Sequence, residues 1–335
     1  MDWPRQQGVH ALGDLPLLSG GVLRDARLSW KAHGTLSPAR DNVIVYPTSY
    51  SAQHPELEWL LGPEGILDTT RWFVVQPDMF GNGLSSSPSN HPDYPALVTS
   101  WDNVQAQKRL LAEVFGVERV ACVYGWSMGA QQAYHWAAAF PQAVERIVAV
   151  CGSARTAVHN QVFLRGLLAV LEAAPEHLGG GRFATEPVAT MRAFARIYAG
   201  WALSQDFYRA GLHLKAEPDL ESFLRTQWEA RWAIRSAANL HAQAKCWDAG
   251  DISANPLYGG DLPRALAAIE ARVLLMPGET DLYFRVADNE AEMPHLRRAA
   301  LRPIPSIHGH RAGNPAGNPA DTEFLRRNVR AWLDG

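Results

Sequence analysis

Three residue types that together activate a hydroxyl nucleophile lie at separate points of this 335-residue chain. Ser127 stands at the centre of Gly125-Trp126-Ser127-Met128-Gly129, a G-x-S-x-G pattern typical of a serine at a sharp strand-to-helix turn. A neutral hydroxyl is a weak nucleophile, so it needs a base to take its proton and an acid to orient that base. The sequence predicts His310 as the base and Asp281 as the acid, because each follows the carboxyl end of a predicted strand.

Other histidines remain alternatives for the base. His308 lies two residues from His310, but Gly309 permits an exposed loop histidine at position 310, which favours His310. His135 is eight residues after Ser127 on the helix that follows it, and that position favours a structural role.

Two carboxylates compete with Asp281 for the role of the acid. Glu279 lies two residues before it, and Asp288 lies deeper in a predicted helix. Asp281 is preferred because it sits in the loop directly after the strand, on the sheet edge that also carries Ser127.

Backbone amides near Ser127 are candidates for binding a developing oxyanion. The helix after the serine begins at Met128, whose N–H can face negative charge at the helix N-terminus. A strand over residues 42–46 runs into a polar loop, and the amides of Thr48 or Ser49 are candidates for the second donor. The alternative is an ordinary polar turn.

The elements that must position these residues alternate between strand and helix. Short apolar runs and helical periodicity predict a doubly wound, mostly parallel sheet, opened by an antiparallel pair within residues 15–33 and closed by a helix over 321–333 capped by Asp321. The predicted inner and last strands cover residues 42–46, 72–76, 120–124, 146–151, 272–276 and 301–307.

A block without strand character interrupts this alternation. Residues 155–256 contain helical stretches at 161–173, 188–203 and 220–245, and many of the 12 tryptophans lie there. An all-helical insertion between two halves of a parallel sheet predicts a lid at the ligand face. The sequence therefore predicts a core of residues 1–154 and 257–335, with a lid of residues 155–256.

Composition excludes several other classes of function. A formal net charge of −3 and no block of Lys or Arg argue against nucleic acid or an acidic membrane surface as partner. No run approaches the roughly 18 apolar residues of a membrane span, and the start lacks a signal-peptide pattern, so a cytoplasmic protein acting on a small molecule is expected. Three widely spaced cysteines predict buried, reduced thiols.

Motifs for a metal or nucleotide cofactor are absent from the sequence. It has no H-E-x-x-H, no paired cysteine spacing and no P-loop, so we expect neither metal nor cofactor.

Taken together, the motifs resemble the homoserine O-acetyltransferase-like family of α/β-hydrolases over nearly the whole chain. The resemblance implies the α/β-hydrolase fold with a helical lid, an acyl-serine intermediate, the triad Ser127, Asp281 and His310, no metal, and a homodimer formed through the lid helices. It is carried by residues 42–50, 80–88 (FGNGLSSSP), 102–107 (DNVQAQ), 125–129 (GWSMG), 152–155 (GSAR) and 309–310 (GH).

Departures from the family bear on the substrate. Where the transferases carry Gly-His-Asp, with the acid linked to the amino group of homoserine, this chain has Arg311 after His310, and a cation there would repel an ammonium group. Phe223 stands where a family tyrosine helps to hold the substrate carboxylate, while Arg196 matches the family's carboxylate-binding arginine. The sequence therefore predicts a serine hydrolase of small carboxylic esters, because the nucleophilic residues are complete while the amino-acid acceptor site is altered. The alternative is an acyltransferase that moves an acetyl group from acetyl-CoA to homoserine or another alcohol.

Overall fold

An eight-stranded sheet forms the centre of the computed structural model, which describes residues 3–215 and 217–335. The spatial order of its strands is β1-β2-β4-β3-β5-β6-β9-β10. The strands are β1 (Arg5–Pro16), β2 (Val22–His33), β3 (Val43–Val45), β4 (Phe73–Pro77), β5 (Cys122–Trp126), β6 (Arg146–Val150), β9 (Arg272–Met276) and β10 (Ala299–Leu301). β1 and β2 pair antiparallel at one edge, and the other six strands run parallel to one another. The predicted mostly parallel sheet is confirmed.

Helices cover both faces of this sheet, which is why its inner strands are apolar throughout. One apolar cluster joins one face to α1 (Ser100–Phe115), α2 (Met128–Ala139) and α9 (Leu262–Ala267). A second cluster joins the other face to α11 (Pro319–Asp334). α10 (Val286–Glu292) lies on the α2 side, where Glu292 accepts a hydrogen bond from the Tyr134 hydroxyl of α2. The parallel strands therefore end at one shared edge between two helical layers.

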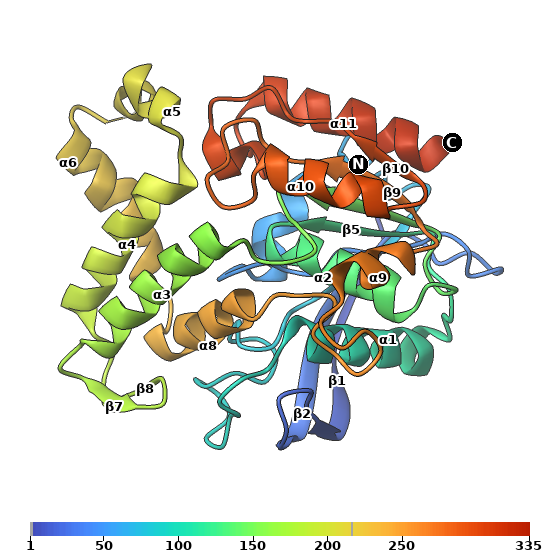
Figure 1. Cartoon of the computed structure of the whole chain (residues 1–335), viewed down its shortest axis with the longest axis horizontal. Coiled ribbons are helices and arrows are strands. Elements are labelled where there is room, and N and C mark those ends of the chain that lie inside the picture. The colour runs from blue at the N-terminus through green and yellow to red at the C-terminus, as the bar shows by residue number, and fades with distance from the viewer. Residues whose placement is uncertain (1–2, 216) are drawn as a thin grey trace.

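Residues 155–256, here called the insertion, project from one end of the sheet (Figure 1). Its helices are α3 (Val158–Glu172), α4 (Val188–Ala202), α5 (Gln205–Arg209), η2 (Leu212–Leu214), α6 (Leu220–Phe223), the π-helix η3 (Leu224–Glu229), α7 (Ala230–Trp232) and α8 (Ala237–Asp248). Residues 220–245, expected as one helix, are therefore divided by a π segment and by the break between α7 and α8. The expectation of helices alone also missed a hairpin, β7 (His177–Gly179) and β8 (Arg182–Phe183), whose turn contains three glycines with positive φ.

Three boundaries of the core also differ from prediction. β1 begins at Arg5 and pairs with β2 over its full length. Its first residues are mostly polar and exposed, so the sequence pattern does not indicate a strand there. β10 covers Ala299–Leu301 and not the predicted 301–307, although the N–H groups of Arg302 and Ile304 still donate to the Leu275 and Pro277 carbonyls. Asn318, and not Asp321, caps α11 by accepting a hydrogen bond from the Asp321 N–H at 3.3 Å.

In the described part of the chain, none of the helices combines the length and apolar character needed to cross a bilayer. All three cysteines are buried and free, as predicted.

Candidate active site

Ser127 occupies a strained turn between β5 and α2. Its φ of 59° and ψ of −127° lie in a region that a residue with a side chain rarely adopts. The flanking glycines make the turn possible: a Cβ on Gly125 would lie 2.1 Å from the Gly129 carbonyl oxygen, and one on Gly129 would lie 2.8 Å from the Pro47 oxygen. The G-x-S-x-G spacing thus lets a helix begin almost against the strand that precedes it and holds the serine at the bend.

His310 and Asp281 lie together beside this turn. The His310 Nδ1 atom is 2.7 Å from Asp281 Oδ2, and Asp281 Oδ1 accepts a hydrogen bond of 2.8 Å from the Tyr283 N–H. The imidazole stacks on Trp126 with ring centroids 5.1 Å apart, and the Tyr283 ring meets it edge-on at 4.9 Å. The carboxylate and these two rings fix the orientation of the imidazole. His310 is buried, whereas the sequence suggested an exposed loop histidine.

The competing histidines and acids lie elsewhere. The His308 Nδ1 atom is 3.2 Å from Asn318 Nδ2, and its ring packs against Phe207. Glu279 is exposed, and Asp288 accepts a hydrogen bond from the Arg285 N–H at the start of α10. His135 is buried on α2, and burial lowers its pKa to about 4, in keeping with a structural role.

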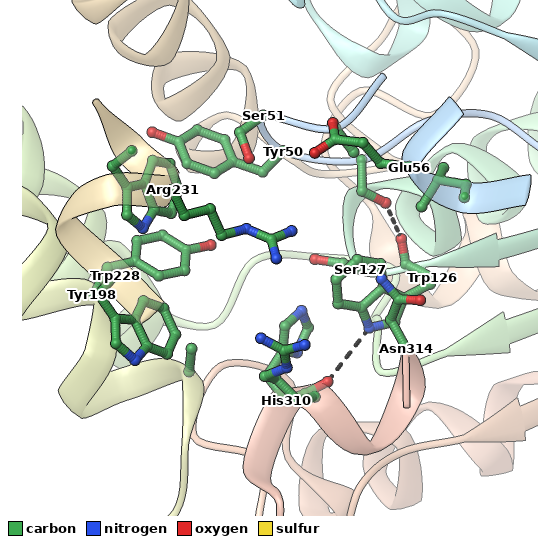
Figure 2. Close-up of a pocket in the computed structure, with 16 residues that line it drawn as sticks. Tyr50, Ser51, Glu56, Trp126, Ser127, Tyr198, Trp228, Arg231, His310 and Asn314 are labelled. Atoms are coloured by element: carbon green, nitrogen blue, oxygen red, sulfur yellow. Dashed lines mark hydrogen bonds between the residues drawn. The ribbon is translucent and has the colours of Figure 1, made fainter. Parts of the chain in front are cut away.

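Ser127 and His310 line one narrow pocket between the sheet edge and the insertion (Figure 2). The pocket has a volume of ≈ 80 Å³. The Ser127 hydroxyl makes no hydrogen bond with the imidazole in this arrangement. In substrate-free structures such bonds are often long or misaligned and tighten when substrate binds. Aromatic side chains from the loop after β3 and from the insertion form the opposite wall: Tyr50, Tyr198, Trp228 and Trp232.

Two backbone N–H groups near Ser127 have no acceptor among the described residues. They belong to Met128, at the first position of α2, and to Ser49, in the loop after β3. The prediction of Thr48 as a donor is wrong, because its N–H donates to the Pro77 carbonyl at 3.2 Å and its hydroxyl accepts from the Met79 N–H. The Ser49 hydroxyl donates to the Trp126 carbonyl and accepts from the Gly129 N–H at 3.3 Å, which ties this loop to the serine turn.

Of the predicted substrate-binding side chains, only Arg311 lines this pocket. Arg196 instead faces a groove on the outside of the insertion and forms ion pairs of 2.5 Å with Glu221 and Glu229. Phe223 packs in the interior of the insertion against Phe207 and Tyr208. Arg196 and Phe223 were both predicted to bind substrate because each matches a motif of the family. Their partners in the structure lie on other helices, which those motifs do not describe.

Sequence reasoning missed Arg231, which extends from α7 into the pocket toward Ser127 (Figure 2). Trp228, Arg231 and Trp232 follow a spacing of three and four residues, so they share one face of a helix. That spacing is a readable signal, but it does not say which face of the insertion meets the sheet edge.

The Cys151 thiol lies beside the histidine and the acid. Ligand atoms of Cys151, Asp281 and His310 lie within 4.8 Å of one another, a set able to hold a metal ion. The imidazole Nδ1 and the carboxylate already bond to each other in this cluster. Burial, followed by the nearby Asp281 charge, raises the pKa of the Cys151 thiol, which makes it a poor nucleophile.

Known proteins similar to this chain include hydrolases and acyltransferases. A family model described as alpha/beta hydrolase fold matches residues 63–205. An ethyl acetate hydrolase of Pseudomonas veronii is 34% identical, with 89% of this chain and 87% of that protein aligned. The solved structure of the acetyl esterase MekB covers 98% of this chain and 97% of its own, with a TM-score of 0.93 and 31% identity. A homoserine O-succinyltransferase of Cupriavidus metallidurans is 28% identical, with 91% and 88% aligned.

Proposed function

Because this chain belongs to the α/β-hydrolase family, and within it resembles both esterases and homoserine acyltransferases, we propose that it is a serine esterase of short-chain carboxylic esters, acetates among them. One observation carries the proposal: a strained serine, an imidazole held by a buried carboxylate, and two N–H groups without acceptors meet around one small pocket.

In the proposed reaction Ser127 Oγ attacks the ester carbonyl carbon while His310 Nε2 takes the hydroxyl proton. Asp281 keeps the proton on Nδ1 and stabilises the imidazolium that forms. The N–H groups of Met128 and Ser49 donate to the oxyanion of the tetrahedral intermediate. The C–O bond to the alcohol then breaks, His310 returns the proton to the departing oxygen, and an acyl-Ser127 remains.

Water completes the cycle. His310 takes a proton from a water molecule, the resulting hydroxide attacks the acyl carbon, and Ser127 recovers its proton when the acid leaves. We take the insertion, residues 155–256, to act as a lid that limits this second step to small acceptors. Support comes from Tyr198, Trp228 and Trp232, which reduce the space above Ser127 to ≈ 80 Å³.

Acyl transfer is the second candidate, since homoserine acyltransferases are relatives of this chain. Arg311 argues against homoserine as acceptor, because a guanidinium next to His310 would repel the ammonium group. The sequence-based expectations of a homodimer formed through the insertion and of a cytoplasmic location belong to the same proposal. Size-exclusion chromatography with light scattering tests the dimer.

Hydrolysis of ethyl acetate and p-nitrophenyl acetate by the purified protein tests the proposal. We expect steady turnover, reduced by several powers of ten in a Ser127→Ala variant with an unchanged circular dichroism spectrum. No turnover above that variant would refute the esterase. Thiol release from acetyl-CoA that depends on added homoserine, and exceeds ester hydrolysis, would favour the transferase instead.

A further inference from the structure

Two arginines converge on the pocket at Ser127 without a carboxylate to neutralise them. Arg311 comes from η5 (Gly309–Gly313), directly after His310, and Arg231 comes from α7 in the insertion. Neither side chain has a hydrogen-bond or ion-pair partner among residues 3–215 and 217–335. Arg231 reaches toward Ser127 from the insertion (Figure 2), and Arg311 lines the same small pocket.

Three neighbouring arginines of the insertion have carboxylate partners. Arg192 and Arg196 pair with Glu229, and Arg235 pairs with Glu56. Glu56 is the one carboxylate that also lines the pocket, and its second oxygen accepts a hydrogen bond from the Gln53 N–H at 3.0 Å. Its charge is thus already shared with Arg235, which leaves the pair Arg231 and Arg311 uncompensated.

An uncompensated pair of cations in a confined space is costly unless a ligand supplies the missing charge. Arg311 is largely removed from water, and its burial, together with the nearby Arg231 charge, lowers its pKa. A guanidinium presents a planar fork of N–H donors that matches a carboxylate in two-point contact. An anionic group between the two side chains would satisfy both sets of donors and remove their mutual repulsion.

The helix geometry just before α7 determines which side chains face the pocket. The π-helix η3 adds a residue to the turn before α7, so Glu229 faces the outer groove with Arg196 while Trp228, Arg231 and Trp232 face the pocket. Single π turns inside α-helices are found frequently at functional sites. Arg231 is itself exposed and lies between the buried rings of Trp228 and Trp232 on the pocket wall, so its guanidinium is open to a ligand that enters from solvent.

We propose that the preferred substrate is an ester that carries a carboxylate a few bonds from its carbonyl carbon, bound by Arg231 and Arg311. This inference rests on the proposed esterase function and specifies its substrate class. The carboxylate belongs either to the acyl group, as in a half-ester of a dicarboxylic acid, or to the alcohol, as in the acetate of a hydroxy acid. Hydrolysis consumes one water and yields an acid and an alcohol in both cases.

Two matched pairs of esters test the proposal with the full-length enzyme at low ionic strength. Monoethyl succinate is compared with ethyl butyrate, and 3-acetoxypropanoate is compared with propyl acetate. We expect kcat/KM to favour the charged ester of at least one pair by about tenfold or more, and the pair that shows it identifies the side of the ester that carries the carboxylate. Preference for the neutral ester in both pairs would overturn the proposal.

Single variants locate the effect. Arg231→Gln and Arg311→Gln should each lower the charged-to-neutral ratio of kcat/KM about 10- to 100-fold. Arg225→Gln is the matched control, because Arg225 lies on the same stretch of the insertion but lines the outer groove, and it should leave the ratio unchanged. Equal ratios in all three variants would contradict the assignment. Arg311→Asp should reverse the preference toward esters that carry an ammonium group.

Binding without catalysis separates this inference from the proposed function. Calorimetric titration of the Ser127→Ala protein with succinate and with 3-hydroxypropanoate should show binding of at least one, weakened tenfold or more when Arg231→Gln or Arg311→Gln is added. A protein that hydrolyses neutral acetates but binds neither carboxylate would overturn the inference and leave the esterase standing. Carboxylate binding without hydrolysis of any of the four esters would support the carboxylate site at Arg231 and Arg311 but refute the esterase and, with it, the proposed substrate class.

Discussion

The sheet edge and the insertion close the same pocket with different kinds of contact. On the sheet edge, directional bonds fix single atoms: Asp281 accepts from the Tyr283 N–H and bonds His310 Nδ1 at 2.7 Å, and the Ser127 backbone is held at a positive φ. On the insertion side, the pocket wall is formed largely by packed rings, and the indole N–H groups of Trp228 and Trp232 have no partner among the described residues. We therefore propose that the sheet edge carries out the chemistry, whereas the insertion selects substrates by size and charge.

The largest expected effect tests the sheet edge directly. His310→Ala removes the proposed base, and kcat for ethyl acetate should fall about 10⁴-fold or more. His308→Ala is the matched control, because His308 bonds Asn318 and does not line the pocket. Steady-state kinetics measure both variants. An equal loss of kcat in His308→Ala and His310→Ala would contradict the assignment of His310 as the base.

A buried acid behind the sheet edge should make stability depend on pH. Glu292 accepts hydrogen bonds from the Tyr134 hydroxyl of α2, the Ala154 N–H and Asn289, and burial raises its pKa to about 7. The native state then holds a proton that the unfolded chain releases between about pH 4.5 and 7, so the free energy of unfolding falls as pH rises through that window. The shift corresponds to about 3 kcal/mol.

Urea unfolding from pH 4.5 to 8 measures this dependence, with Glu292→Gln as the comparison. The variant has no proton to lose, so its stability should change less over this range than that of the native sequence. Parallel curves for the two proteins would show that Glu292 does not carry the effect.

The packing of the insertion should affect selectivity more than rate. Trp232 is buried, lines the pocket and contacts the rings of Tyr50, Phe194 and Tyr198. Trp232→Ala enlarges the space above Ser127, so the ratio of kcat/KM for a hexanoate ester to that for an acetate ester should rise about tenfold. Trp201→Ala, also in the insertion but outside the pocket lining, provides the control. An unchanged chain-length profile would contradict the role of the ring.

The sequence predicted the sheet edge better than it predicted the insertion. The core was predictable because the G-x-S-x-G turn and the apolar strands are local patterns, and the fold and family were recognised correctly. The positions of Arg196, Phe223 and Arg231 were not, because they depend on which helices of the insertion meet across long distances in sequence. The amide of Thr48 was assigned wrongly for a more local reason: beyond the end of β3, the N–H groups of Tyr46 and Thr48 still donate to the β4 carbonyls of Val75 and Pro77.

The smallest effect should come from the outer surface of the insertion. Arg196→Met breaks the ion pairs with Glu221 and Glu229 at the surface of the insertion, where solvent screens such pairs, so we expect little or no loss of stability in urea unfolding. The kcat/KM for ethyl acetate should remain within about twofold of the native value, because Arg196 does not line the pocket. A large rise in KM would instead restore Arg196 as a substrate-binding residue.

Covalent trapping at the sheet edge tests the central claim most directly. Diethyl p-nitrophenyl phosphate transfers its phosphoryl group to an activated serine with release of p-nitrophenolate, and peptide mass spectrometry locates the adduct. The account predicts one adduct per chain, on Ser127, formed in step with the loss of esterase activity and greatly slowed in His310→Ala. Complete inactivation with Ser127 unmodified, or equally rapid labelling of Ser127 in the His310→Ala variant, would contradict it.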